Sequence, residues 1–370
     1  MNAYLHIPFC ASICSYCDFT SFAGQEGRIG AYVRALCLEI ERSPMEGPLR
    51  TVYFGGGTPS LLPPGSLQNI LQTLRQKAGF DSSAEISMEA NPETVDLEKL
   101  RAYRGLGVNR ISFGAQSSQT EILKKLGRGH DWEQVRKSYF AAREAGFDNL
   151  NLDLMLGLPG QTLELFQQSL EMAADIHPDH LSLYALQVEE GTPLSRQVGA
   201  GLQIPTGDEM ADQYSWAQDF LTGEGFEQYE VSNFARPGKS CRHNWNIWRG
   251  EDYWGFGVGA VGTVKGIRRT HGEDLMKYIQ SLSDGKIPEL TEEELGDSIR
   301  EFERLMLGFR TREGVLKEAV DHYAARTGVS YTETFNRFQG EGLLSLEEGR
   351  YRVTSKGFFL LNGILEALVA

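Results

Sequence analysis

The sequence predicts an α/β protein in which a partial, open parallel β/α barrel precedes a small C-terminal domain that is mainly helical and winged-helix-like. Strand patterns alternate with helix patterns over the first half of the chain, which is typical of successive βαβ units. After Pro288 the pattern changes to helices and one hairpin. The length of 370 residues also favours two domains, which we assign to residues 1–288 and 289–370.

The barrel is predicted from short apolar runs that each precede a loop and a helical pattern. Six such runs occur, at residues 3–7, 51–54, 85–89, 110–114, 150–155 and 180–186. Apolar residues with helical spacing follow them, as at Leu67, Ile70, Leu71 and Leu74 after the second run. Six units of this kind indicate a parallel sheet that closes into a partial or open barrel.

The C-terminal domain is predicted to begin where Pro288 precedes the acidic run Glu292–Glu294. One helix is expected directly after this run and a second helix further on, followed by a hairpin around Glu348–Gly349 and a last helix from Ser355. Winged-helix folds often bind DNA, but the acidic character of this segment favours a protein contact or a lid.

The composition argues against several classes of function. The formal net charge of −14 disfavours nucleic acid as a partner, because phosphate contacts need a concentrated basic surface. The sequence contains no apolar run of the length of a membrane span, and Met1–Tyr4 does not resemble the start of a secretory signal. The five cysteines are odd in number and clustered, so we expect a reducing, cytoplasmic location rather than a disulfide framework.

Three cysteines, Cys10, Cys14 and Cys17, have the spacing C-x3-C-x2-C, which is typical of a metal centre. Three thiolates on a [4Fe-4S] cluster leave one iron without a protein ligand, so a small molecule with an amine and a carboxylate could chelate it. A structural zinc site needs four ligands, and His6 could supply the fourth. Plain buried thiols are the remaining interpretation.

Polar or glycine residues stand just past each apolar run, where the strands of a parallel barrel open on one face. These residues are Cys10, Gly55–Thr58, Glu89, Gln116, Asp153 and Tyr184. The glycines would let backbone amides approach a ligand, although a tight turn has the same composition. Glu89 would accept from an ammonium or a ribose. Asp153 fits either a ligand site or a satisfied core carboxylate, and its place before Gly157–Gly160 favours the ligand site.

The combination of these motifs closely resembles the radical S-adenosylmethionine proteins related to oxygen-independent coproporphyrinogen III oxidase. The matching motifs are Tyr4-x-His6-Ile7-Pro8-Phe9-Cys10-x3-Cys14-x-Tyr16-Cys17, Gly55–Pro59, Glu89-x-Asn91-Pro92, Gln116-Ser117, Gly127-Arg128 and Asp153-Leu154-x-x-Gly157-Leu158-Pro159. The resemblance covers most of the chain, including the C-terminal domain. It implies a partial barrel of the radical S-adenosylmethionine type.

The resemblance also implies two cofactors and the residues that hold them. In that family three cysteines bind a [4Fe-4S] cluster, and the open iron binds S-adenosylmethionine, which reductive cleavage converts to a deoxyadenosyl radical. The residues implied to bind S-adenosylmethionine are Tyr4, Tyr16, Gly56, Gly57, Thr58, Glu89, Gln116, Arg128, Asp153 and Ala185. Some of these positions serve a second S-adenosylmethionine in the oxidase.

Two departures from the oxidase pattern resemble a haem-chaperone branch of the same family. The oxidase has a fourth cysteine two residues beyond the third, where this chain has Phe19, and a long extension before its first motif, where this chain has three residues. The branch has a His-Asn-x-x-Tyr-Trp motif, which reads His243–Trp248 here with Ile247 in place of the tyrosine. Val261 stands where a histidine is common.

His243 is the candidate haem ligand, because a neutral imidazole is the usual axial ligand of haem iron and tryptophans surround it in the sequence. The alternative is a hydrogen-bonded corner that closes the barrel. Cys241 is interpreted as an incidental free thiol, Cys37 as a core residue, and the other histidines as surface or structural. The pattern Gly257-x-Gly259-x-x-Gly262 follows no suitable strand and has no acidic residue about twenty positions on, so we reject a dinucleotide site.

The leading hypothesis is a haem chaperone that holds a [4Fe-4S] cluster and S-adenosylmethionine, binds haem as cargo and delivers it to apo-haemoproteins, with transient contact to membrane-bound clients. The main rival is an anaerobic coproporphyrinogen III oxidase or another radical enzyme acting on a tetrapyrrole, so enzymatic activity stays open. A zinc-binding structural protein is the third hypothesis. The sequence leaves the subunit number open between a monomer and a dimer.

Overall fold

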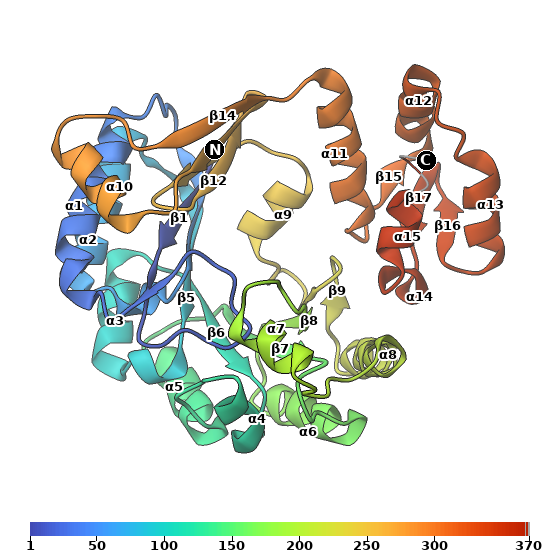
Figure 1. The fold of residues 1–370 in the computed structure, drawn as a ribbon, viewed down its shortest axis with the longest axis horizontal. Helices are drawn as coiled ribbons and strands as arrows, with labels where there is room; N and C mark the ends of the chain where they lie inside the picture. Colours follow the sequence, from blue (N-terminus) through green and yellow to red (C-terminus); the bar gives the residue numbers. More distant parts are fainter. Residues whose placement is uncertain (367, 369–370) are drawn as a thin grey trace.

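A computed structural model describes residues 1–366 and residue 368 of the chain. A twelve-stranded, mostly parallel sheet curves through the first three quarters of the chain (Figure 1). Six of its strands correspond to the predicted runs: β1 (Asn2–Ile7), β4 (Leu49–Gly56), β5 (Phe80–Ala90), β6 (Arg110–Gln116), β7 (Leu150–Leu156) and β8 (His180–Ala185). They pair in parallel in this order, which confirms the predicted fold class.

Amphipathic helices cover the outer face of the sheet, where their apolar sides bury the apolar side of each strand (Figure 1). These helices are α1 (Ile29–Arg42), α2 (Pro64–Lys77), α3 (Leu97–Leu106), α5 (Trp132–Glu144), α6 (Leu163–Ala174) and α8 (Gly207–Gly223). Several begin at a residue whose side chain accepts a hydrogen bond from the first turn, as Asp96, Asp131, Thr162 and Thr206 do. These four helices therefore have a start that their own sequence defines, whereas α1 and α2 begin without a side-chain cap.

The barrel remains open, because short strands extend both edges of the described sheet without joining each other; their pairs are antiparallel, except that the strand beside β1 is parallel to it. Beside β1 lie β11 (Tyr253–Phe256), β12 (Val261–Val264), β13 (Ile267–His271) and β14 (Leu290–Glu294), and beside β8 lie β10 (Asn233–Ala235) and β9 (Glu227–Gln228). The helix α10 (Leu275–Ser283) packs on α1. Strand β14 lies beyond Pro288, yet it pairs with β13. We therefore propose that the two domains divide between β14 and the helix that follows it.

The C-terminal residues form helices around a three-stranded sheet of order β15-β17-β16, beside the barrel (Figure 1). The elements are α11 (Asp297–Phe309), β15 (Val315–Leu316), α12 (Lys317–Thr327), α13 (Thr332–Gly340), β16 (Leu344–Glu347), β17 (Arg350–Val353), α14 (Ser355–Phe358) and α15 (Leu361–Glu366). The hairpin β16–β17 confirms the expected winged-helix-like arrangement. No helix in the described part of the chain is long and apolar enough to cross a membrane.

A β-bridge joins the two domains. Glu230, which follows β9, pairs with Thr311 after α11. The guanidinium of Arg312 donates to the side chains of Gln228 and Ser355, at 2.7 and 2.8 Å, and lies 5.0 Å from the ring centre of Phe358. These contacts fix the last helices of the C-terminal domain against the β8 edge of the barrel.

The barrel interior is polar. Inward-facing positions alternate along each strand and carry residues such as Glu85, Arg110, Asn151 and His180, all buried. At the end opposite the strand tips, α9 (Arg242–Trp248) closes the barrel. The backbone N–H groups of Arg242 and His243 donate to the Glu85 carboxylate at 2.9 and 3.0 Å.

Candidate functional site

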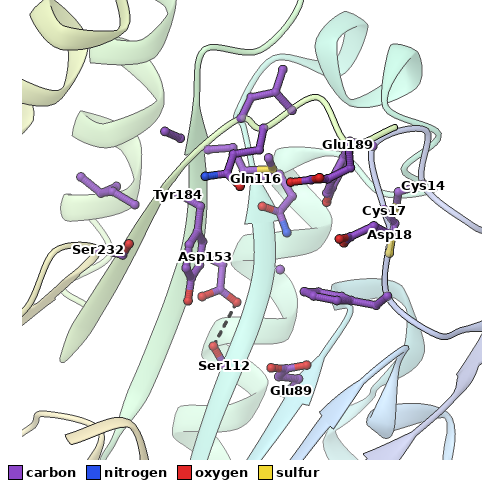
Figure 2. Close-up of a pocket in the computed structure, with 18 of the residues that line it drawn as sticks. Cys14, Cys17, Asp18, Glu89, Ser112, Gln116, Asp153, Tyr184, Glu189 and Ser232 are labelled. Carbon is purple, nitrogen blue, oxygen red and sulfur yellow. Dashed lines mark hydrogen bonds between the residues drawn. The ribbon is translucent and has the colours of Figure 1, made fainter. Parts of the chain in front are cut away.

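A cavity of about 800 Å³ opens where the parallel strands end. Its lining combines the cysteine loop, the tips of β4 to β8 and residues of the C-terminal domain. Figure 2 shows Glu89, Ser112 and Asp153 near Tyr184, with Cys14, Cys17 and Asp18 on the opposite side. The strand-end residues predicted from the sequence thus share one mouth.

The three cysteines lie at the edge of this cavity, on a loop that short strands hold at both ends. Cys10 ends β2 (Phe9–Cys10), which pairs with β3 (Phe22–Ala23) beyond the loop. The Nε2 of His6 lies 2.7 Å from the carbonyl oxygen of Thr20 and must donate to it. The Nδ1 of His6 therefore accepts from the Tyr4 hydroxyl, 3.1 Å away. Both ring nitrogens of His6 are thus used in fixing the loop, and His6 does not join the thiols as a ligand.

The segment after α4 (Thr120–Lys125) supports the middle of the loop. The Ser15 N–H donates to the carbonyl of Leu126 at 2.9 Å. The guanidinium of Arg128 donates to the sulfur of Cys14 at 3.5 Å and to the carbonyl of Gly114 at 2.7 Å. A Cβ at position 114 would lie 2.4 Å from the Arg128 guanidinium, so a side chain there would displace Arg128 from this position. The Gly127-Arg128 motif therefore positions the cysteine loop.

The donor set fits an iron–sulfur cluster better than a single ion. All three thiols are free of disulfides, and burial raises the pKa of Cys10 and of Cys17. Donors that favour a thiolate lie close, because the Thr58 hydroxyl is 3.5 Å from the Cys10 sulfur and Arg128 contacts Cys14. Within the described residues no group of three or more histidine, cysteine or acidic side chains is gathered tightly enough for one metal ion. A cluster spreads its thiolates around several irons.

The glycine-rich turn after β4 is shaped by close backbone packing. The N–H groups of Gly57 and Thr58 donate to the carbonyls of Ile7 and Phe9, at 2.9 and 2.7 Å. A Cβ at position 57 would lie 2.8 Å from the Phe9 carbonyl oxygen and 3.0 Å from the Cys10 sulfur. These two N–H groups are therefore already hydrogen-bonded to the chain around the cysteine loop, and a ligand can contact only the other atoms of the turn.

Two carboxyl groups, Glu89 on β5 and Asp153 on β7, line the cavity floor on either side of β6. Burial, with a further contribution from Asp153, raises the pKa of Glu89 to about 7. Burial also raises the pKa of Asp153, although the hydroxyls of Ser182 and Ser112 oppose this shift. The Tyr53 hydroxyl donates to Glu89 at 2.9 Å, and Ser112 donates to Asp153 at 3.0 Å. The floor can therefore hold a cationic or hydroxyl-bearing ligand, which would favour the ionised carboxylates.

A bulge at the end of β6 brings Gln116 into the site. The strand register shifts between Gly114 and Gln116, and Gln116 has a φ of +64°, a conformation that non-glycine residues seldom adopt. The cavity lining includes Cys10, Cys14, Cys17, Tyr16, Gly56, Gly57, Thr58, Glu89, Gln116, Arg128, Asp153 and Ala185. Tyr4 is not in the lining and instead stacks near Tyr53 at 6.3 Å.

His243 lies at the closed end of the barrel, outside the cavity lining. Its Nδ1 is 2.8 Å from the Thr51 hydroxyl, which itself donates to Asn2 at 3.0 Å, so Nδ1 carries the proton. The ring stacks 5.1 Å from the ring of Tyr53, and burial lowers the pKa of His243 to about 3. Its Nε2 has no hydrogen-bond partner among the described residues. The structure thus separates the candidate haem ligand from the cysteines, and haem ligation by His243 stays a prediction.

A polar network that was not predicted from the sequence lies beneath the carboxylates. The Asn151 amide donates to Asp153 at 2.7 Å and its oxygen accepts from Nδ1 of His180 at 2.6 Å. His180 in turn accepts from the Tyr229 hydroxyl at 2.8 Å. The signal for this network was the alternation of polar residues within apolar runs, as in Asn151-Leu-Asp153 and His180-Leu-Ser182. The Gly257–Gly259 turn, where we rejected a dinucleotide site, packs on His6, Tyr32 and Thr20.

Together, an open βα barrel, a three-cysteine loop at its mouth and paired carboxylates on its floor define a radical S-adenosylmethionine protein. Residues 4–173 match the model of the radical SAM superfamily, and residues 300–360 match that of the HemN C-terminal domain. The structure is similar to that of coproporphyrinogen III oxidase (HemN) from Escherichia coli, with a TM-score of 0.85 and 24% identity over 99% of this chain and 89% of that chain. This match shows the shared fold.

Full-length relatives place the chain more closely. It is 35% identical over 367 residues to the heme chaperone HemW of Lactococcus lactis, covering 99% of this chain and 96% of that protein. It is 33% identical over 385 residues to the heme chaperone HemW of Escherichia coli, covering 100% and 98%. The chain belongs to the HemW family. Membership of the radical SAM superfamily implies a [4Fe-4S] cluster and S-adenosylmethionine as cofactors.

Proposed function

We propose that this protein binds haem and delivers it to apo-haemoproteins, while Cys10, Cys14 and Cys17 hold a [4Fe-4S] cluster and the cavity holds S-adenosylmethionine. The observation that carries the proposal is the similarity over the whole chain to relatives named heme chaperones. Phe19 adds support, because it replaces the fourth cysteine of the oxidase pattern and is 65% exposed at the cavity edge.

The cofactor part of the proposal rests on the cavity. Arg128 and Thr58 donate to two of the thiols, which favours thiolates able to bind iron. Glu89, Gln116 and Asp153 line the same space and supply oxygen atoms for an ammonium and for ribose hydroxyls. When bound, S-adenosylmethionine on a reduced cluster supplies radical chemistry. The protein's own residues hold the ligand and orient it.

The test uses the full chain, reconstituted with iron and sulfide without oxygen. We expect about four irons per chain, the number of one cubane cluster, and a Soret band that saturates on titration with haem. Mixing the loaded protein with an apo-haemoprotein should then move the haem absorbance to that of the acceptor. Absence of haem binding by a protein with full cluster content would contradict the proposal.

The same sample separates the proposal from its alternatives. Turnover of coproporphyrinogen III in the presence of S-adenosylmethionine and a reductant would assign the enzymatic function instead. Zinc without iron in protein purified anaerobically would assign the structural metal site. A localisation in the cytoplasm and contact with membrane-bound clients belong to the same proposal, and co-purification of haemoproteins with the chain tests them.

A further inference from the structure

The cavity has two chemically different halves. The half at the cysteine loop and barrel floor carries the acidic side chains Asp18, Glu89, Asp153 and Glu189. The half at the C-terminal domain is lined largely by apolar and aromatic side chains, namely Leu183, Tyr184, Tyr214, Val231, Phe358, Phe359 and Leu361. The acidic half suits a cationic ligand, whereas the aromatic half offers flat apolar surface.

Arg310 is the charged residue of the aromatic half. It directly follows α11, and its backbone carbonyl accepts from the N–H of Val231 at 2.9 Å, so the barrel edge fixes its position. The cationic residues in the described lining are Arg128 and Arg310. Arg128 is already bonded to Cys14 and Gly114, whereas the guanidinium of Arg310 makes no hydrogen bond or ion pair with any described residue.

The acidic residue whose charge acts on Arg310 does not neutralise it fully. Glu230 is fully buried and accepts from the N–H of Ser232 at 3.0 Å and from Asn233. Burial raises the pKa of Glu230 to about 7, so near neutral pH a large fraction of this group is uncharged. A half-buried guanidinium beside exposed aromatic surface is then left to bind an anion brought by a ligand.

We propose that the half of the cavity between β8 and α14–α15 binds the carboxylate edge of a planar tetrapyrrole, with the Arg310 guanidinium bonding a propionate. The proposal rests on the haem-binding function proposed above and locates the haem-binding site in this part of the cavity. Tyr184, 41% exposed, and Phe359 supply the surface for the macrocycle. Because the C-terminal domain provides Arg310 and Phe359, both domains build this site.

Haem titration of the reconstituted full chain tests this assignment, with iron protoporphyrin IX and its dimethyl ester compared in the same dilute detergent. We expect Arg310→Gln to weaken haem binding about 5- to 20-fold, the loss typical of one charged hydrogen bond. Arg310→Lys should recover part of the affinity. The ester should bind the wild-type protein less tightly than haem, and Arg310→Gln should not weaken ester binding further.

The matched control is Arg337→Gln on α13, whose side chain is mostly exposed and outside the cavity lining. Iron content, S-adenosylmethionine binding and melting temperature should be the same in all variants, because Arg310 contacts neither the cysteine loop nor the barrel floor. Equal affinity of Arg310→Gln and wild type for haem, or equal affinity for haem and ester, overturns this assignment alone. Failure of the wild type to bind haem overturns the proposed function itself.

Discussion

Glu85 and His243, 158 residues apart in the chain, meet at the closed end of the barrel, where the His243 N–H donates to the Glu85 carboxylate at 3.0 Å. The same carboxylate accepts from the N–H of Arg242 at 2.9 Å and from the Ser87 hydroxyl at 3.2 Å. One buried acid on β5 thus satisfies the first N–H groups of α9 and fixes this helix under the barrel.

We expect Glu85→Gln to lower the free energy of unfolding by about 2–4 kcal/mol, because the amide cannot accept all these bonds and its NH2 group opposes the backbone donors. Urea unfolding followed by circular dichroism measures the change. The control is Glu292→Gln on β14, whose pair with Arg269 is exposed and should contribute less than about 1 kcal/mol. A loss equal to that of the control would show that Glu85 does not support α9.

His243→Gln separates a structural role from haem ligation. We expect a loss of about 1–3 kcal/mol in unfolding free energy, since the ring packs on Tyr53 and donates to Thr51 in a buried site. The Soret spectrum of the haem-loaded variant decides the second question. A shifted or lost band at full haem content would confirm the predicted ligand, and an unchanged band would contradict it.

The order of the six central strands could be predicted because each strand and the helix after it are local in sequence and carry their own periodicity. The cysteine loop and the strand-end residues followed from the same pattern, because parallel strands bring residues such as Glu89 and Asp153 to one edge. These residues line one cavity because the strands are parallel and adjacent. The regular alternation of strand and helix patterns in the sequence already predicts this arrangement.

The edges of the sheet could not be predicted in this way. Strand β11 pairs with β1 across about 250 positions, and β9 and β10 are two and three residues long, too short for a periodic signal. The position of Arg310 in the cavity could not be predicted either, because it depends on how the C-terminal domain packs on Val231 of the barrel. In both cases tertiary packing decides the position, and no local pattern encodes it.

Gly57→Ala tests the close packing behind the cysteine loop. We expect lower iron and sulfide content after reconstitution, because the added Cβ would lie 3.0 Å from the Cys10 sulfur and 2.8 Å from the Phe9 carbonyl, and one of them must move. The matched control is Gly65→Ala in α2, where nothing lies within 4 Å of the new Cβ. That variant should keep full cluster content and gain up to about 1 kcal/mol from helix propensity.

Arg312→Ala tests the contact between the domains. The change removes hydrogen bonds to Gln228 and Ser355 and the stacking on Phe358, so we expect faster proteolysis between β14 and α11 and weaker haem binding. Arg337→Ala removes an exposed arginine that lies 5.2 Å from Phe338 within the C-terminal domain and serves as the control. If both variants resist protease equally, the Arg312 contacts do not hold the domains together.

The raised pKa of Glu89 should make the stability of the fold and the binding of ligand depend on pH. Its pKa in the folded protein is about 7 and its ordinary value is 4.5, so folding favours the protonated form between these values. The group therefore destabilises the ligand-free fold increasingly as the pH rises from 4.5 to 7. Glu89→Gln should remove this effect. The unfolding free energy of Glu89→Gln minus that of wild type should therefore be larger at pH 8 than at pH 5, by on the order of 1–3 kcal/mol.

Binding of S-adenosylmethionine should favour the ionised form of Glu89, whereas folding favours the protonated form. The reason is that the ammonium and ribose hydroxyls of the ligand bind the ionised carboxylate. We expect the affinity of the wild-type protein to rise as the pH increases through 7, and the affinity of Glu89→Gln to be lower and nearly independent of pH in this range. Isothermal titration at several pH values measures both, with Glu98→Gln on the exposed face of α3 as the control. An unchanged pH profile in Glu89→Gln would assign the titration to Asp153, the other buried carboxyl group of the cavity floor.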